Sequence, residues 1–181
     1  MWMKDTRKKS EFHITLPKIG DELAIGTMHV QGWKEAYLNS ELGITEEYID
    51  DLIGHYVTDT AYRKNTLVEA LKHPDRVFYR VVKNERGEIV GFFHCAKNET
   101  DNVLEGIYLL NEAKGAGVGT QLMNEFIAWS DKDKPYRLEV FSFNTTAINF
   151  YKKFGFKEVA GSPLLYKNKI PYIEMVRRAE N

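Results

Sequence analysis

Three closely spaced glycines, Gly115, Gly117 and Gly119, most constrain what this 181-residue chain can fold into. The apolar, strand-like run 104–110 leads into them, and a helical pattern of apolar residues follows directly. Glycine lets the backbone turn tightly and leaves its N–H groups free of side chains. Such N–H groups at a helix N-terminus, together with the helix dipole, bind phosphate. The loop therefore predicts a pyrophosphate cradle at a strand-to-helix junction.

Two common phosphate-binding patterns do not fit this loop. A Walker loop places Lys-Ser or Lys-Thr directly after its last glycine, whereas Thr120 and Gln121 follow Gly119. A dinucleotide fingerprint has the spacing G-x-G-x-x-G, and here the third glycine comes one residue early. Glu139 lies where a ribose-binding acid belongs, but a dinucleotide fold opens with this unit, which here comes late in the chain. We therefore reject both patterns.

The composition is that of an ordinary globular protein, with 43% hydrophobic and 28% charged residues. A net charge of −1 argues against nucleic acid as a partner. No apolar run reaches the ~20 residues of a membrane span. The charged segment 1–10 has no apolar stretch behind it, so we interpret it as no secretory signal. We expect a cytoplasmic protein without a membrane partner.

Cysteine and histidine indicate no metal site. The single cysteine, Cys95, lies in the apolar run 89–95, which excludes a disulfide framework within the chain and predicts a buried strand residue. The five histidines show no ligand spacing. They are His13, His29, His55, His73 and His94. We expect no bound metal.

Hydrophobic periodicity predicts a mixed α/β (α+β) protein with a partly antiparallel sheet. The expected strands are 12–16, 77–82, 88–94, 103–110, 137–141, 159–160 and 173–176. The expected helices are 21–38, one beginning after Thr45, 60–71, 118–130 and 145–154. In the first helix we expect Leu23, Thr27, Val30, Trp33 and Tyr37 to share one face. Asn84–Gly87 predicts a hairpin turn.

A second motif lies one strand beyond the glycine loop. Residues 144–151 read Asn-Thr-Thr-Ala-Ile-Asn-Phe-Tyr, and Gly155-Phe156 follows. With Lys114–Gly119, this motif resembles the two signatures of the GNAT superfamily of acetyl-CoA-dependent N-acetyltransferases, Arg/Gln-x-x-Gly-x-Gly/Ala and Asn-x-x-Ala-x-x-x-Tyr before Gly-Phe. Lys114 replaces the usual Arg or Gln. Because the cradle is mostly backbone, we expect this change to tune affinity and not abolish it.

The resemblance implies a GNAT-like, largely antiparallel sheet of six to seven strands flanked by helices. It also implies a single N-acetyltransferase domain over 1–181. Within it, the helices of about 20–72 would face the acceptor, and about 77–159 would form the acetyl-CoA-binding core. Family members are often dimers, so a homodimer is one assembly that the resemblance suggests.

The resemblance also implies binding residues for acetyl-CoA as co-substrate. The pyrophosphate would be bound by Lys114, Gly115, Ala116, Gly117, Val118, Gly119 and Thr120. The pantetheine arm would add like a β-strand to the edge formed by Ile107, Tyr108 and Leu109. The Leu109 N–H would then donate to the thioester oxygen. Asn144 would bond the arm from the other side, act as a helix N-cap, or do both.

Two residues are candidates for proton transfer. Tyr151 matches the tyrosine that protonates the departing thiolate in this family. We favour this role over that of a core aromatic, which its helical stripe also fits. Glu105 resembles a base position of some members, and strict strand alternation places it on one face with Ile107 and Leu109. A surface glutamate or a water relay is an equally good interpretation for Glu105.

We therefore expect an N-acetyltransferase acting on a primary amine of a small molecule, of polyamine, aminoglycoside or amino-acid type. Acids in the N-terminal helices would favour a cationic acceptor, yet most are typical of a solvated face. They are Asp21, Glu22, Glu35, Glu41, Glu46, Glu47, Asp50, Asp51 and Glu69. Trp33 and Tyr37 are core residues or part of the acceptor groove. A protein or peptide N-acetyltransferase and a non-catalytic acyl-CoA-binding regulatory module are the alternatives.

Overall fold

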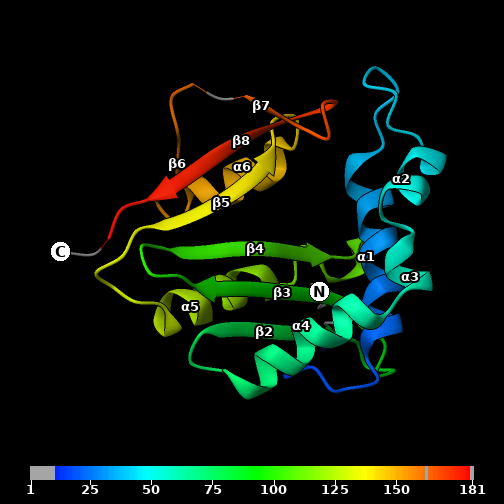
Figure 1. Cartoon of the computed structure of the whole chain (residues 1–181), viewed down its shortest axis with the longest axis horizontal. Coiled ribbons are helices and arrows are strands. Elements are labelled where there is room, and N and C mark those ends of the chain that lie inside the picture. Colours follow the sequence, from blue (N-terminus) through cyan, green and yellow to red (C-terminus); the bar gives the residue numbers. More distant parts are fainter. Residues whose placement is uncertain (1–10, 162, 180–181) are drawn as a thin grey trace, which may run out of the picture.

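A mixed sheet covered by helices on both faces forms the protein (Figure 1). The computed structural model describes residues 11–161 and 163–179. The segment 1–10, interpreted above as no secretory signal, lies outside this range. In the described ranges no helix is both long and apolar enough to span a membrane. The predicted mixed α/β class is confirmed.

Eight strands form the sheet in the described residues, one more than the sequence indicates. They are β1 (His13–Thr15), β2 (Val77–Lys83), β3 (Ile89–Lys97), β4 (Asn102–Leu109), β5 (Tyr136–Phe141), β6 (Lys157–Glu158), β7 (Leu164–Tyr166) and β8 (Ile170–Arg177). The additional strand is β7, which pairs with β8. The short β6 lies just before the position expected for it.

The strand order is β1-β2-β3-β4-β5-β8-β6, with β7 also on β8. Every pair is antiparallel except β4 and β5, which are parallel. The β2–β3 hairpin turns where predicted. There Gly87 has a φ of 78°, and the Asn84 side-chain oxygen accepts hydrogen bonds from the N–H groups of Arg86 and Glu88. The side chain of Asn84 thus closes this turn.

The parallel strands β4 and β5 pair only at their beginnings. Residues 102–104 lie against residues 136–138, and beyond them the two strands diverge (Figure 1). The fully buried Asn102 holds the closed end together. Its amide donates to the carbonyls of Asp131 and Lys134 (2.9 and 3.3 Å) and accepts from the Asp131 N–H (3.0 Å). The sheet therefore opens as a V between β4 and β5.

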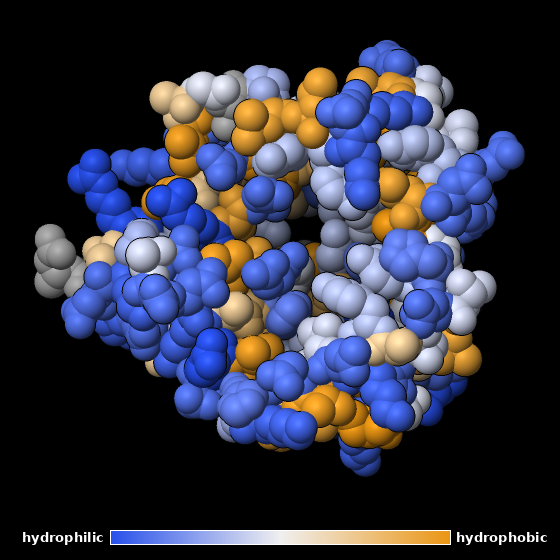
Figure 2. Space-filling model, viewed as in Figure 1, coloured by the Kyte–Doolittle hydropathy of each residue, from blue (hydrophilic) through white to orange (hydrophobic). Residues whose placement is uncertain are grey.

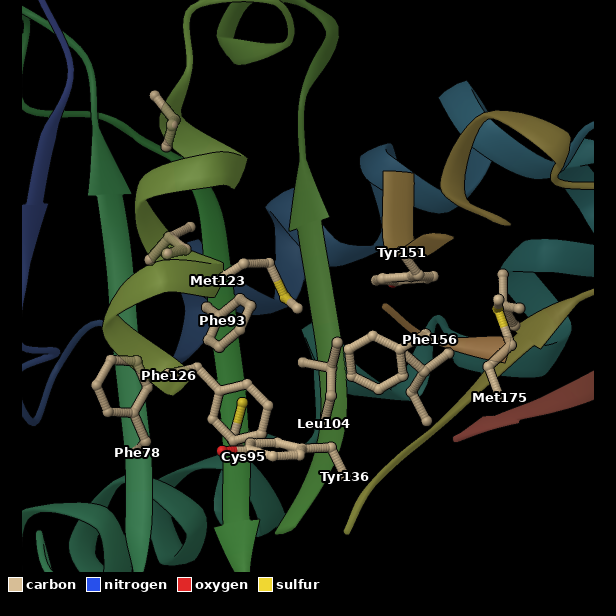
Figure 3. Packing of buried hydrophobic residues seen from close by; sticks show 14 of the residues in the cluster. Phe78, Phe93, Cys95, Leu104, Met123, Phe126, Tyr136, Tyr151, Phe156 and Met175 are labelled. Carbon is tan, nitrogen blue, oxygen red and sulfur yellow. The ribbon is translucent and has the colours of Figure 1, made fainter. Parts of the chain in front are cut away.

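Different helices cover the two faces of the sheet. They are α1 (Glu22–Tyr37), α2 (Glu46–Ile53), α3 (His55–Thr58), α4 (Ala61–Lys72), α5 (Val118–Trp129) and α6 (Thr145–Lys152), with a 3-10 turn at Asn111–Ala113. Helices α5 and α6 pack on the face that holds Phe78, Phe93 and the fully buried Cys95 (Figure 3). Helices α1 and α4 pack on the opposite face, which holds Tyr79 and Phe92. Alternation along β2 and β3 thus supplies two cores.

The inward face of α1 differs from the one expected. Leu23 is 53% exposed and Thr27 is also exposed, whereas Ile25, Met28 and His29 are buried with Trp33. The expected stripe starts on the wrong residue, because the sheet packs against the side of α1 that carries the histidine. The N-cap expected at Thr45 is confirmed, since its hydroxyl accepts from the Tyr48 N–H at 3.1 Å.

Candidate functional site

A cavity of about 960 Å³ lies where the V of the sheet meets α1 and α4. Figure 2 shows the surface hollowed near the middle of this view, between β5 and β8 on one side and α1 on the other. One half of the cavity is lined by β4, the glycine loop and α6. The other half is lined by α1, α4 and the facing side chains of β2 and β3. We call them the loop half and the helix half.

The open edge of β4 lies in the loop half. The Leu110 N–H donates to the Val90 carbonyl (2.8 Å), and hydrogen-bonded pairs alternate with non-bonded ones along an antiparallel ladder. By this register, Ile107 and Leu109 are not hydrogen-bonded to β3. Their N–H and C=O groups therefore point into the V, where β5 has already diverged. This edge can accept one more extended chain.

The glycine loop lies at the mouth of the V. Gly115 and Gly117 have φ values of 77° and 86°, which only glycine adopts without strain. A Cβ at Gly119 would lie 3.4 Å from the Phe150 ring and 3.6 Å from Leu109, so little space is left there for a longer side chain. The main chain thus leaves the loop with exposed N–H groups and enters α5 at Val118. These groups, at the positive end of the α5 dipole, suit an anion.

The seven predicted loop residues do not all face the cavity. Those that line it are Lys114, Gly115, Gly117, Gly119 and Thr120. Ala116 packs against the core, and Val118 is part of it. The Lys114 ammonium donates to the Asn111 side chain at 2.7 Å. Lys114 is thereby held at the mouth of the cavity, while Ala116 and Val118 can contribute only their backbone.

Asn144 and Tyr151 line the cavity from the α6 side. The Asn144 side-chain oxygen accepts from the Ala147 N–H at 3.1 Å, so the N-cap role is present. Tyr151 is 6% exposed, and its ring lies on the β5 side of β4 (Figure 3). Burial, and next the nearby Tyr108, raise the pKa of Tyr151, so its phenol keeps its proton. Tyr151 is both a core residue and a wall of the cavity.

A β-bulge sets the position of Glu105. Cys95 pairs with Leu104 and His94 with Gly106, which leaves Glu105 as an extra residue in β4. The strict alternation assumed for this strand is therefore wrong at Glu105. The carboxyl group lines the cavity together with Glu139. Burial, and next repulsion from Glu139 and Asp101, raise the pKa of Glu105, which makes it a better proton acceptor.

Apart from Trp33 and Tyr37, the helix half is built from side chains that the sequence did not mark as a site. Of the nine acids considered there, only Glu35 lines the cavity, and it accepts the Asn111 N–H at 2.7 Å. Instead the wall contains Arg63, His29 and Tyr79, with Tyr56 beside them. Trp33 and Tyr37 are both buried in aromatic contacts and in contact with the cavity. The nine acids therefore form no acidic wall of the cavity, and most of them are exposed, as the interpretation of a solvated face predicts.

A signal for Arg63 was nevertheless present in the sequence. The residues of α4 that face the sheet are Arg63, Leu67 and Ala70, spaced by four and then three residues. An arginine in line with an apolar stripe is unusual, because its charge must be buried. His29 could have been found in the same way only if the inward face of α1 had been assigned correctly.

Potential metal ligands do not cluster in the described ranges. No group of three or more histidine, cysteine, aspartate or glutamate side chains is arranged to hold a metal ion there.

Comparisons with known proteins agree with this geometry. The model of the acetyltransferase (GNAT) family matches residues 41–156, well over half of the chain. No curated protein matches the sequence. The structure of PaiA N-acetyltransferase from Thermoplasma acidophilum in complex with coenzyme A superposes with a TM-score of 0.74. It is 20% identical, and the match covers 93% of this chain and 99% of that one.

Two further structures share the fold. Ard1 from Thermoplasma volcanium has a TM-score of 0.61 and 22% identity, over 94% of this chain and 99% of that one. The ribosomal-protein-S18-alanine N-acetyltransferase from Escherichia coli has a TM-score of 0.57 and 15% identity, over 94% and 96% of the two chains. At such identities these likenesses establish the fold alone.

Proposed function

The chain belongs to the acetyltransferase (GNAT) family, and from that membership we propose that it transfers acetyl from acetyl-CoA to a primary amine of a small molecule. One observation carries the proposal: the unpaired edge of β4 and the glycine loop open into the same cavity. A ligand with a strand-like arm and a pyrophosphate fits both at once. Coenzyme A has these two parts.

In this proposal the backbone holds the donor. The loop N–H groups from Lys114 to Thr120 bind the pyrophosphate, and the β4 groups of Ile107 and Leu109 bind the arm. The Leu109 N–H donates to the thioester oxygen and stabilises the negative charge that develops there during attack. Tyr108 lies between these residues, and its side chain points to the helix half. Asn144 bonds the arm from α6 in addition to capping that helix.

The side chains of Tyr151 and Glu105 move the protons. Glu105 takes a proton from the ammonium, directly or through water, so that the nitrogen lone pair can attack the thioester carbon. The new C–N bond forms as the carbonyl π electrons move to oxygen. Their return breaks the C–S bond. Tyr151 protonates the departing sulfur, and the nitrogen of the new C–N bond gives up its second proton, directly or through water, to the Tyr151 phenolate. Coenzyme A leaves as the thiol, the product is a neutral amide, and Tyr151 has its proton again. The raised pKa of Tyr151 keeps this proton available over the neutral range.

Two alternatives to a small-molecule N-acetyltransferase can be distinguished by experiment. A protein or peptide N-acetyltransferase would bind a chain in the helix half, which side chains of α1, α3 and α4 line. A non-catalytic acyl-CoA-binding module would bind coenzyme A without turnover. Tyr151 in the cavity wall favours catalysis over binding alone.

The test is thiol release from acetyl-CoA across a panel of amines, with coenzyme A binding followed by calorimetry. We expect at least one small amine to raise release far above the hydrolysis rate. Tight coenzyme A binding with no amine-dependent release would instead establish the regulatory module. Release with peptides but with no small amine would establish the peptide enzyme.

A further inference from the structure

The helix half of the cavity contains a buried cation without a carboxylate. Arg63 is only 6% exposed, and its guanidinium lies 5.1 Å from the centre of the Tyr56 ring and 5.4 Å from that of Phe92. Among the described residues no aspartate or glutamate forms an ion pair with it. Its Nε has no hydrogen-bond partner in that part of the chain either. A buried charge in this state is costly.

The neighbours of Arg63 make the shortage of acceptors worse. The Trp33 indole N–H donates to His29 Nε2 at 3.0 Å, so that nitrogen carries the lone pair. A neutral imidazole then has its proton on Nδ1, which faces the Arg63 Nη2 at 3.2 Å. Two donors therefore oppose each other. The other tautomer only moves the conflict to Trp33, and a charged imidazolium would oppose both groups.

With the proton of His29 on Nδ1, a hydroxyl oxygen is the one hydrogen-bond acceptor of Arg63 among residues 11–161 and 163–179. The Tyr79 oxygen lies 3.3 Å from Nη1. Burial, and next the positive charge of Arg63, lower the pKa of His29 to about 3 and that of His94 to about 4. The two histidines therefore add no charge near neutral pH, and they add no anion either. The cluster of Arg63, His29, Trp33 and Tyr79 has surplus donors and an uncompensated positive charge.

Carboxylates occur elsewhere in the same cavity. Glu35 lines it from α1, where it accepts the Asn111 N–H, and no ion pair joins it to Arg63. Glu105 and Glu139 line it near the V, where burial together with nearby acids raises the pKa of each. The cavity thus has an acidic end beside the open edge of β4 and a basic end beside Arg63. Arg63 lies over Phe92 on β3, and the V lies beyond the next strand, β4. Two strand spacings, on the order of 10 Å, separate the two ends.

We propose that Arg63 binds an oxyanion of the acceptor, so that the substrate is an amine carrying a carboxylate or similar group several bonds from the reacting nitrogen. This inference rests on the proposed acetyltransferase function and narrows its acceptor class. The oxyanion provides lone pairs for the unpaired guanidinium N–H groups and for the surplus donor at His29. The ammonium end lies at Glu105, beside the thioester.

The test compares three amines that share one chain length: aminohexanoate, hexylamine and diaminohexane. We expect kcat/KM for aminohexanoate to exceed that of each of the others at least about tenfold. In Arg63→Gln the ratio of kcat/KM for aminohexanoate to kcat/KM for hexylamine should fall to about one, because the guanidinium that would pair with the carboxylate is gone. Arg63→Lys should keep part of the preference. Arg86→Gln, the same change at an exposed hairpin residue, should keep all of it.

Hexanoate provides a readout that needs no variant. It lacks the amine, so we expect it to compete with the acceptor and not with acetyl-CoA. This measurement decides the matter if the Arg63 variants fail to fold. Equal or better turnover of hexylamine or diaminohexane, or the absence of competition by hexanoate, would overturn the inference and leave the acetyltransferase proposal intact.

A rise in the acetyl-CoA KM of Arg63→Gln with an unchanged amine preference would assign Arg63 to the donor instead. If no amine of any kind raised thiol release above the hydrolysis rate, the proposed function itself would be refuted.

Discussion

The two halves of the cavity are built from different parts of the chain. The loop half is mainly backbone: a glycine loop, a helix N-terminus and an unpaired strand edge. The helix half consists of side chains from α1, α4, β2 and β3, which meet only after folding. The first can bind a ligand whose shape is constant, and the second can change with the acceptor. The following experiments ask how far this division holds.

The largest effect is expected for Tyr151→Phe in the loop half. Loss of the phenol should lower kcat about 100- to 1000-fold, within the range for general acid catalysis. The ring still packs with Phe150 and Phe156, so acetyl-CoA binding should stay within about threefold. Single-turnover kinetics and calorimetry measure the two quantities. If binding falls together with kcat, Tyr151 is structural.

The next largest effect is expected for Gly119→Val. A Cβ at this position already lies 3.4 Å from Phe150 and 3.6 Å from Leu109, and the two extra methyl groups would be forced into the α5–α6 contact and the cavity. We expect coenzyme A affinity to fall about 100-fold, or about 2.7 kcal/mol. Gly119→Ala is the matched control and should lose far less. Equal binding by all three proteins would show that pyrophosphate lies elsewhere.

We expect two histidines of the helix half to make the free energy of unfolding depend on pH. His29 and His94, with pKa values of about 3 and 4, stay neutral when folded, whereas the unfolded chain takes up protons near pH 6.5. Above pH 6.5 these two histidines therefore do not lower the free energy of unfolding. Below it, each histidine lowers that free energy by up to about 1.4 kcal/mol per pH unit, until the folded pKa is reached.

Urea unfolding between pH 7 and pH 5.5 measures this slope. His94→Gln should remove about half of it, whereas His13→Gln, at an exposed position of β1, should not change it. A slope that is the same in all three proteins would show that these histidines do not control acid stability. It would also weaken the contrast between the halves, because the loop half contains no buried histidine among its lining residues.

The smallest effect is expected for Asn144→Ser, which separates the two roles of Asn144. Serine is as good an N-cap as asparagine, so stability should hold, whereas Asn144→Ala should cost about 1 kcal/mol. Both variants lack the amide that would bond the pantetheine arm. We expect both to raise the acetyl-CoA KM about 3- to 10-fold, as for one lost hydrogen bond. An unchanged KM in Asn144→Ser would leave Asn144 as a cap alone.

The sequence predicted most of the fold, because periodicity is a local property. The helices of the N-terminal region, the β2–β3 hairpin and the turn from β4 into α5 follow from residues close together in the chain. The errors have tertiary causes. The face of α1 depends on how the sheet packs on it, and the position of Glu105 depends on a bulge set by pairing with β3. A single domain and a homodimer remain predictions.

By itself the sequence determined the loop half. Gly115 and Gly117 mark positive-φ backbone that other residues adopt only with strain, and Asn144 and Tyr151 follow one strand later. Only the tertiary structure decided the helix half. It buries Arg63 against His29, 34 positions apart in sequence, and leaves that charge without a carboxylate. Local patterns record how the backbone turns. Whether a buried cation has an anionic partner depends on every group that folding brings close to it, so only the folded chain reveals the unpaired charge.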